Sequence, residues 1–215
     1  MTLTPWPFVV FDLDGTVADT IDLIIASYAH AVNSVVGVPL DPLRARRWIG
    51  RTLNDVMAEE WPGRDTEVLA EYLAFNVVKA PEYIKPFPGM NELLDELERN
   101  GIRTAVATSK RAASAAQTLE LIGATLSVAI TMEDTLQHKP DPEPLLLAVS
   151  RLGGDASRAA YVGDAVVDVV AAKAAGMASI AVTWGAGDRS DLVASEPTAV
   201  VDTLAQLRAV LLGLA

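Results

Sequence analysis

Two aspartates at the end of the first strand-like run carry the clearest chemical signal in this sequence. Residues 8–11, Phe-Val-Val-Phe, lead into Asp-Leu-Asp-Gly-Thr over residues 12–16. Side chains two apart in an extended chain point to the same side, so Asp12 and Asp14 are expected to face one pocket. Two carboxylates this close need a cation between them, or a proton on one of them. Either arrangement suits phosphoryl transfer, with Asp12 as nucleophile and Asp14 as acid and then base.

The segment Asp-Leu-Asp-Gly-Thr after a first strand resembles the haloacid dehalogenase-like hydrolase superfamily. The resemblance continues in Thr-Ala-Val-Ala-Thr-Ser over residues 104–109, where the family has a threonine or serine that binds phosphoryl oxygens. It implies that Thr108 is catalytic and that Thr16 and Ser109 bind substrate. The family's phosphatases and phosphomutases have an aspartate at the position of Asp14 and its dehalogenases lack one, which indicates phosphoester chemistry.

Two later segments complete the resemblance. Lys139, in His-Lys-Pro-Asp-Pro over residues 138–142, matches the family's lysine, whose ammonium offsets charge on the nucleophile and the phosphate. Asp164 and Asp168, after the strand-like run Ala-Tyr-Val, match the aspartates that hold Mg²⁺ directly or through water. They lie four residues apart at the start of an expected helix and so share a face.

The balance of charge predicts a divalent cation. Four carboxylates, those of Asp12, Asp14, Asp164 and Asp168, would meet a dianionic substrate with only Lys139 to offset them. Mg²⁺ takes oxygen ligands and bridges carboxylates to phosphate, so all four are candidate magnesium ligands. A zinc site with Cys or His ligands is not expected, because the chain has no cysteine and both histidines lie outside the acidic segments.

Composition sets the outer limits on function. The chain has 215 residues, of which 51% are hydrophobic, and its formal net charge is −11. Its apolar runs are too short to span a bilayer, and its start lacks the features of a signal peptide. The negative charge argues against binding to nucleic acid or to membrane surfaces. A cytoplasmic protein without disulfides is expected, and the sequence does not indicate its oligomeric state.

Strand-like and helical segments alternate along most of the chain, which predicts an α/β fold with a doubly wound parallel sheet. Ligands bind such sheets beyond the carboxyl ends of the strands, where Asp12, Thr108 and Asp164 fall. The expected strands are 8–12, 102–107, 127–131, 159–163 and 178–182, and the expected core helices are 91–100, 111–122 and 165–175, each helix before a glycine.

Residues 17–85 break the alternation, because they show helical periodicity without a clear buried strand. The stretch is too long for a loop. The family carries an α-helical cap at this position, so residues 17–85 are expected to form the cap, and 1–16 with 86–215 the core. Hinges are expected at 16–19 and 85–89. The expected cap helices are 21–36, 42–48, 53–61 and 66–79.

Arginines cluster in the expected cap, at positions 44, 46, 47 and 51. Most of them are read as a solvated helix face. Arg51, or Trp48 nearby, is the better candidate for touching the leaving group, because related caps place a specificity loop near this position.

The sequence therefore predicts a Mg²⁺-dependent phosphatase acting on a small phosphate monoester. Each segment alone has a structural explanation as turn or helix-cap residues, and their order and spacing favour the site. The pattern looks most like the phosphoglycolate phosphatase group. A sugar phosphomutase or a pyrophosphatase would share these residues. A receiver-like signalling module or a non-catalytic binding protein fits less well, because a receiver has no cap and the charge set is complete.

Overall fold

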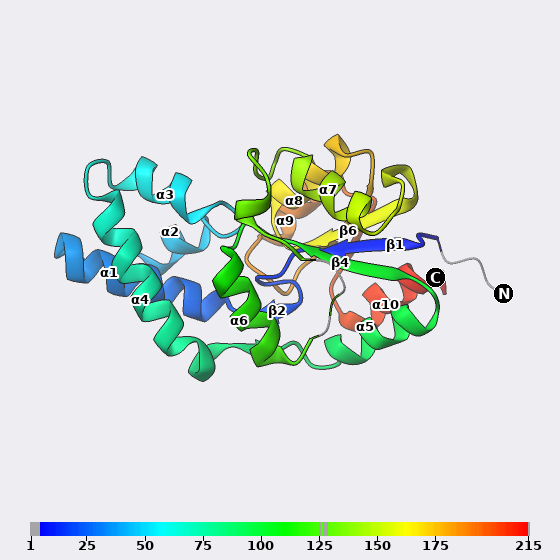
Figure 1. Ribbon diagram of the computed structural model, residues 1–215, viewed down its shortest axis with the longest axis horizontal. Coiled ribbons are helices and arrows are strands. Elements are labelled where there is room, and N and C mark those ends of the chain that lie inside the picture. The colour runs from blue at the N-terminus through cyan, green and yellow to red at the C-terminus, as the bar shows by residue number, and fades with distance from the viewer. Residues whose placement is uncertain (1–4, 125, 127–128, 215) are drawn as a thin grey trace.

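Six parallel strands form the central sheet of the protein, in the order β5-β4-β1-β6-β7-β8 (Figure 1). The structure is a computed structural model that describes residues 5–124, 126 and 129–214. The predicted doubly wound α/β fold is confirmed, and β8 is an additional strand. Positions 127–128 of the expected third strand lie outside the described residues. The strands are β1 (Phe8–Phe11), β4 (Arg103–Ala107), β5 (Ala129–Ile130), β6 (Ala159–Gly163), β7 (Ala178–Val182) and β8 (Ala199–Val201).

Helices cover both faces of this sheet, because side chains along each strand alternate between them. Val9 and Phe11 of β1 pack in a cluster with α5 (Met90–Arg99), α6 (Ala112–Ile122) and α10 (Leu204–Leu212). Phe8 and Val10 pack in a second cluster on the opposite face. That cluster includes residues of α7 (Glu143–Arg151) and α8 (Val166–Ala174), which Figure 1 shows above the sheet. A short helix, α9 (Arg189–Ala194), follows β7.

The three core helices expected from the sequence are confirmed to within one residue at each end. Gly123 shows why glycine ends such helices, since it takes a left-handed backbone with φ of 66° after α6. The sequence pattern did not indicate α7, α9 and α10. Among the described residues, none of the helices is long and apolar enough to cross a membrane.

Four helices form the inserted region at the left of Figure 1, where the sequence predicted an all-α cap. They are α1 (Ile21–Val36), α2 (Pro42–Arg46), α3 (Leu53–Glu60) and α4 (Asp65–Tyr83). Their shared hydrophobic cluster includes Tyr28, Trp48 and Tyr72. Helix α4 continues past the expected end at residue 79, with the Ile84 N–H bonded to the Ala80 carbonyl at 2.9 Å.

Two short antiparallel strands join the helical insertion to the core. They are β2 (Ala18–Asp19) and β3 (Lys85–Pro86). Each falls within a segment expected to act as a hinge, so both crossings between the two parts lie side by side. That residues 17–85 move as a separate domain stays a prediction.

The order of the strands places the chemically promising residues together. β1 lies between β4 and β6, so the chain first winds towards β5 and then returns to wind the other way. Phe11 at the end of β1 is in register with Val106 and Val162. The carboxyl ends of the three strands therefore meet at one switch point, where doubly wound folds bind their ligands.

Leu97 tests the packing of the core. Its side chain is fully buried on α5 within the cluster that includes Val9 and Phe11. We expect Leu97→Ala to lower the free energy of unfolding by about 2–5 kcal/mol, because it leaves a cavity against the sheet. Urea denaturation measures this, and Glu98→Ala, an exposed change on the same helix, is the control. Equal stability of the two variants would contradict the packing described.

Candidate active site

Three buried carboxylates meet at the switch point. One oxygen from each of Asp12, Asp164 and Asp168 lies within 4.8 Å of the other two. The three residues are only 3%, 1% and 1% exposed. Asp12 follows β1, Asp164 follows β6, and Asp168 lies in the first turn of α8, so the geometry depends on neighbouring strands and on where this helix begins.

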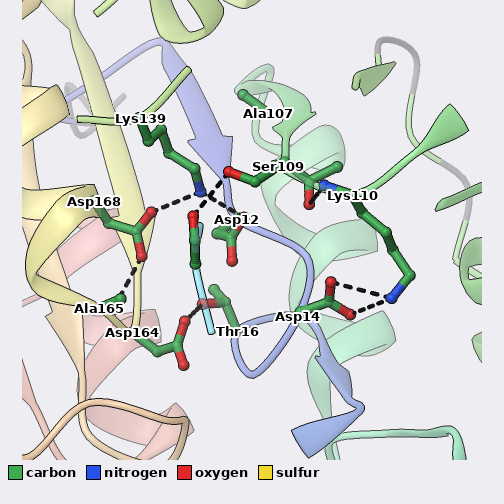
Figure 2. Close-up of polar contacts among 12 residues, drawn as sticks. Asp12, Asp14, Thr16, Ala107, Ser109, Lys110, Lys139, Asp164, Ala165 and Asp168 are labelled. Atoms are coloured by element: carbon green, nitrogen blue, oxygen red, sulfur yellow. Dashed lines mark hydrogen bonds and ion pairs between the residues drawn. The ribbon is translucent and has the colours of Figure 1, made fainter. Parts of the chain in front are cut away.

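Lys139 provides the positive charge in this cluster. Figure 2 shows its ammonium between Asp12 and Asp168, at 2.8 Å and 2.7 Å from their Oδ1 atoms. It also donates to the Tyr161 hydroxyl at 3.0 Å, and that hydroxyl donates to the Ala107 carbonyl at 2.9 Å. Tyr161 thus positions the lysine. The role of Tyr161 was not predicted from the sequence. The available signal was one large polar side chain among the smaller residues of the buried strand Ala159–Gly163.

The remaining carboxylate oxygens of Asp164 and Asp168 are also held. The Thr16 hydroxyl donates to Asp164 Oδ1 at 3.2 Å, and the Ala186 N–H donates to Oδ2 at 2.5 Å. The Ala165 N–H donates to Asp168 Oδ2 at 3.0 Å. By contrast, no hydrogen bond among the residues that the structure describes reaches Oδ2 of Asp12. This oxygen is therefore the one available to react.

Glycine is required beside Asp164 because the carboxylate leaves no space for a side chain. A Cβ atom on Gly185 would lie 2.1 Å from Asp164 Oδ2, and one on Gly15 would lie 2.4 Å from the same oxygen. Gly15 also has a φ of +75°, in the left-handed region that favours glycine. The glycine of the Asp-Leu-Asp-Gly-Thr segment thus serves both the turn and the packing of the acidic cluster.

The electrostatics of the cluster suit a cation. Burial, with the neighbouring Asp168, raises the pKa of Asp12 from 3.8 to about 7, against the opposing effect of Lys139. Burial and the other two carboxylates raise the pKa of Asp164 well above its usual value. Burial alone would lower the pKa of Lys139, but the carboxylates of Asp12 and Asp168 raise it well above the ordinary range. Three carboxylates thus face one permanent ammonium, and their oxygens are the ligands that Mg²⁺ prefers.

Asp14 lies apart from this cluster. Its two carboxylate oxygens accept from Lys110 Nζ at 2.8 Å and 3.1 Å (Figure 2). Asp14 lies apart because the strand ends at Phe11 and the chain then forms a turn, in which the N–H groups of Val17 and Ala18 donate to the Leu13 carbonyl. The alternation expected for an extended chain therefore does not continue to Asp14. Of the four predicted metal ligands, three lie together and the fourth pairs with a lysine.

Lys110 is the second site residue whose role was not predicted from the sequence. Its side chain is 8% exposed and that of its partner Asp14 is 14% exposed. Lys110 comes directly after Thr108 and Ser109, and this position next to two predicted site residues is the sequence feature that could have indicated its role. The Thr108 hydroxyl accepts from the Lys110 N–H at 3.2 Å, and Thr108 is itself buried.

A cavity lies between the inserted helices and the sheet, next to Asp14. Its lining includes both predicted contacts from the insertion, Trp48 and Arg51, together with Ser109 and Lys110. Arg51 pairs with Glu59 at 2.5 Å. The Trp48 indole N–H donates to Glu60 at 3.1 Å. The Ser109 hydroxyl donates to the Gly50 carbonyl of the insertion at 2.8 Å, so this residue connects the core to the helices above it.

The doubly wound sheet, the helical insertion and the acidic centre at the strand ends define a class of capped α/β enzymes. A model of the haloacid dehalogenase-like hydrolase family matches residues 9–182, so the chain belongs to this family and is a hydrolase. The expected resemblance is confirmed.

Individual relatives resemble the chain over almost its whole length. The pyrophosphatase PpaX of Bacillus velezensis is 35% identical over 201 residues, which are 93% of each chain. A phosphoglycolate phosphatase of Agrobacterium fabrum is 32% identical, over 94% of this chain and 90% of its own length. A solved structure of a haloacid dehalogenase-like hydrolase from Bacteroides fragilis has a TM-score of 0.86 and 26% identity, covering 94% of this chain and 99% of that one.

The stability of the metal-free protein should depend on pH in a predictable direction. The pKa of Asp12 is about 7 in the folded protein against 3.8 as its ordinary value, and that of Asp164 is also raised. A raised folded pKa contributes stability that is present at low pH and is lost as pH rises through the folded value. With chelator present, we expect the free energy of unfolding to fall by roughly 2–4 kcal/mol between pH 5 and 8.

Urea denaturation at several pH values measures this loss of stability. Asp12→Asn serves as the control, because it removes the carboxylate whose pKa is about 7 and should flatten the profile. An equally steep profile in wild type and variant would contradict the assignment.

Proposed function

We propose that the protein is a Mg²⁺-dependent phosphatase that hydrolyses small phosphate monoesters through an aspartyl-phosphate on Asp12. The observation that carries this proposal is the buried cluster of Asp12, Asp164 and Asp168 around a single lysine, Lys139. Its place at the switch point of the sheet and the phosphatase names of the relatives support it.

The residues of the cluster fit a divalent cation, and Asp12, Asp164 and Asp168 would hold it. When bound, Mg²⁺ offsets the negative charge of the carboxylates and of the phosphoryl oxygens. Lys139 adds a fixed ammonium beside Asp12, and the Tyr161 hydroxyl keeps that ammonium in place.

In the proposed first step, Asp12 Oδ2 attacks phosphorus, a new O–P bond forms, and the bond from phosphorus to the leaving oxygen breaks. For this step Asp14 leaves its ion pair with Lys110 and carries a proton. It gives that proton to the leaving oxygen, so the product leaves as an alcohol. Lys139 and Thr108 stabilise the phosphoryl oxygens during transfer.

In the second step, Asp14 takes a proton from water. The water oxygen bonds to phosphorus, the bond from phosphorus to Asp12 Oδ2 breaks, and phosphate leaves Asp12 as a free carboxylate. Asp14 can serve both steps because it faces the cavity under the insertion and not the acidic cluster. Its partner Lys110 holds the carboxylate in that position.

The cavity indicates the class of substrate. It is lined by the cations Arg51, Lys110 and Arg111 and by the aromatic side chains of Tyr28 and Tyr72. We propose a small leaving group that carries its own negative charge, as the phosphoglycolate hydrolysed by one relative does. Pyrophosphate is the second candidate, since another relative is named a pyrophosphatase.

Arg51 provides a test of this cavity. We expect Arg51→Ala to lower kcat/KM for an anionic substrate about tenfold, because it removes a charged hydrogen-bond donor from the cavity. Steady-state kinetics should show the loss mainly in KM. Arg47→Ala, an exposed change nearby, is the control. An unchanged kcat/KM in the Arg51 variant would remove this residue from the substrate site.

The phosphatase proposal is tested by measuring phosphate release from phosphoglycolate, pyrophosphate, sugar phosphates and nucleoside monophosphates, with Mg²⁺ and with chelator. We expect metal-dependent release that is lost in Asp12→Ala, because this variant has no nucleophile. Asp14→Asn should lower kcat by about 10²–10⁴-fold for esters with poor leaving groups, since the proton donor is gone.

Esters with good leaving groups serve as the internal control for the Asp14 variant, because they need little protonation. Release that persists in Asp12→Ala, or that ignores chelator, would contradict the proposed mechanism. Conversion of a sugar phosphate without phosphate release would identify a mutase instead.

A further inference from the structure

Arg46 reaches from the helical insertion to the core at a point that the proposed mechanism does not use. Its Nε donates to the Ala186 carbonyl at 2.9 Å, and its Nη2 donates to the Gly185 carbonyl. Arg46 ends α2, and the two carbonyls belong to the loop that follows β7. The side chain is partly buried in this contact. The guanidinium thus donates hydrogen bonds to two successive carbonyls of a core loop.

The same loop holds Asp164. The Ala186 N–H donates to Asp164 Oδ2 at 2.5 Å, and the Gly187 N–H donates to the Asp164 carbonyl at 3.0 Å. A Cβ atom on Gly187 would lie 2.3 Å from that carbonyl oxygen. Ala186 therefore gives its carbonyl to the insertion and its N–H to a carboxylate of the acidic cluster. A shift of the loop by a few tenths of an ångström would therefore move the Asp164 carboxylate, because the two are packed in direct contact.

A second set of hydrogen bonds connects Oδ1 of Asp164 to Thr16, in the expected hinge at residues 16–19. The Thr16 hydroxyl donates to Asp164 Oδ1 at 3.2 Å, and the Thr16 carbonyl accepts from the Trp184 indole N–H at 3.3 Å. Thr16 lies two residues before β2, where the chain enters the insertion. Both oxygens of Asp164 are thus held by residues that contact, or lie next to, the helical insertion.

We propose that Arg46 is a positioning residue that couples the closed position of the helical insertion to the orientation of Asp164, and so to Mg²⁺ affinity. This inference rests on the proposed function, because it takes Asp164 as a metal ligand. The coupling is reciprocal: if closure strengthens metal binding, metal binding favours closure to the same extent. The insertion then closes most firmly over a loaded site.

Arg47 provides a matched comparison. It follows Arg46 and lines the same cavity between insertion and core, but its side chain is exposed and forms no hydrogen bond or ion pair with the residues that the structure describes. Removing either arginine removes one positive charge near an acidic site, which by charge alone strengthens binding of a cation. Loss of the Arg46 contact should weaken binding instead. The two explanations therefore predict opposite signs.

The experiment is a calorimetric titration of the substrate-free protein with Mg²⁺, using wild type, Arg46→Ala, Arg47→Ala and Asp164→Asn. We expect Arg46→Ala to raise the Kd about tenfold, near the lower end of the loss seen when a supporting partner of a metal ligand is removed. Arg47→Ala should leave the Kd unchanged or lower it, and Asp164→Asn should abolish binding.

Hydrogen exchange gives a second readout. Mg²⁺ should protect the backbone N–H groups of Ala18 and Asp19 in β2 and of Lys85 in β3 in the wild type, and protect them less in Arg46→Ala. If Arg46 had only a structural role, its replacement would change the protection of these amides equally with and without Mg²⁺.

The outcomes separate the two proposals. If wild type binds no Mg²⁺, the proposed function fails. If wild type binds Mg²⁺ and the two arginine variants show the same Kd, the coupling fails while the proposed function stands. If Arg46→Ala does not fold, the charge-conserving pair Arg46→Lys and Arg47→Lys decides. Weaker Mg²⁺ binding by the Arg46 variant alone supports the coupling, and equal binding overturns it.

Discussion

Three buried carboxylates that share one ammonium are the constraint on which the rest of this structure depends. Burying such an excess of negative charge is costly unless each group is paired, hydrogen-bonded or neutralised. Lys139 lies between Asp12 and Asp168, the Tyr161 hydroxyl supports the lysine, and N–H groups or hydroxyls hold the other oxygens of Asp164 and Asp168. A divalent cation would complete this balance, so we infer that the folded site is built for a metal-loaded state.

The reacting groups and the cavity wall that controls access to them come from different elements of the fold. Strand ends fix the acidic cluster, and the helical insertion supplies one wall of the cavity beside Asp14. Ser109 and Arg46 connect the two parts through the Gly50 carbonyl and through the loop at Ala186. Closing the insertion over the cavity would keep water from the reacting groups. The contacts of Ser109 and Arg46 would link that movement to the catalytic residues.

The sequence predicted the sheet, the core helices α5, α6 and α8, and the acidic residues, because periodicity, glycine stops and short motifs are local signals. It did not indicate roles for Tyr161 and Lys110, and its interpretation of Arg46 as part of a solvated helix face was wrong, since Arg46 is half-buried and bonded to the core. The importance of these residues comes from partners far away in the chain. Lys110 pairs with a residue 96 positions away and Arg46 with one 140 positions away. The turn after Phe11 also explains why Asp14 lies apart from Asp12, since strand alternation holds only while the chain stays extended.

The three carboxylates should form one divalent-cation site beside Lys139. The most direct test is a crystal structure of the protein with Mn²⁺ in place of Mg²⁺, read by anomalous scattering. We expect a single strong peak bounded by Asp12, Asp164 and Asp168, with the Asp14 carboxylate outside the coordination sphere. A peak at another site, or a cluster that stays without metal at saturating Mn²⁺, would contradict it.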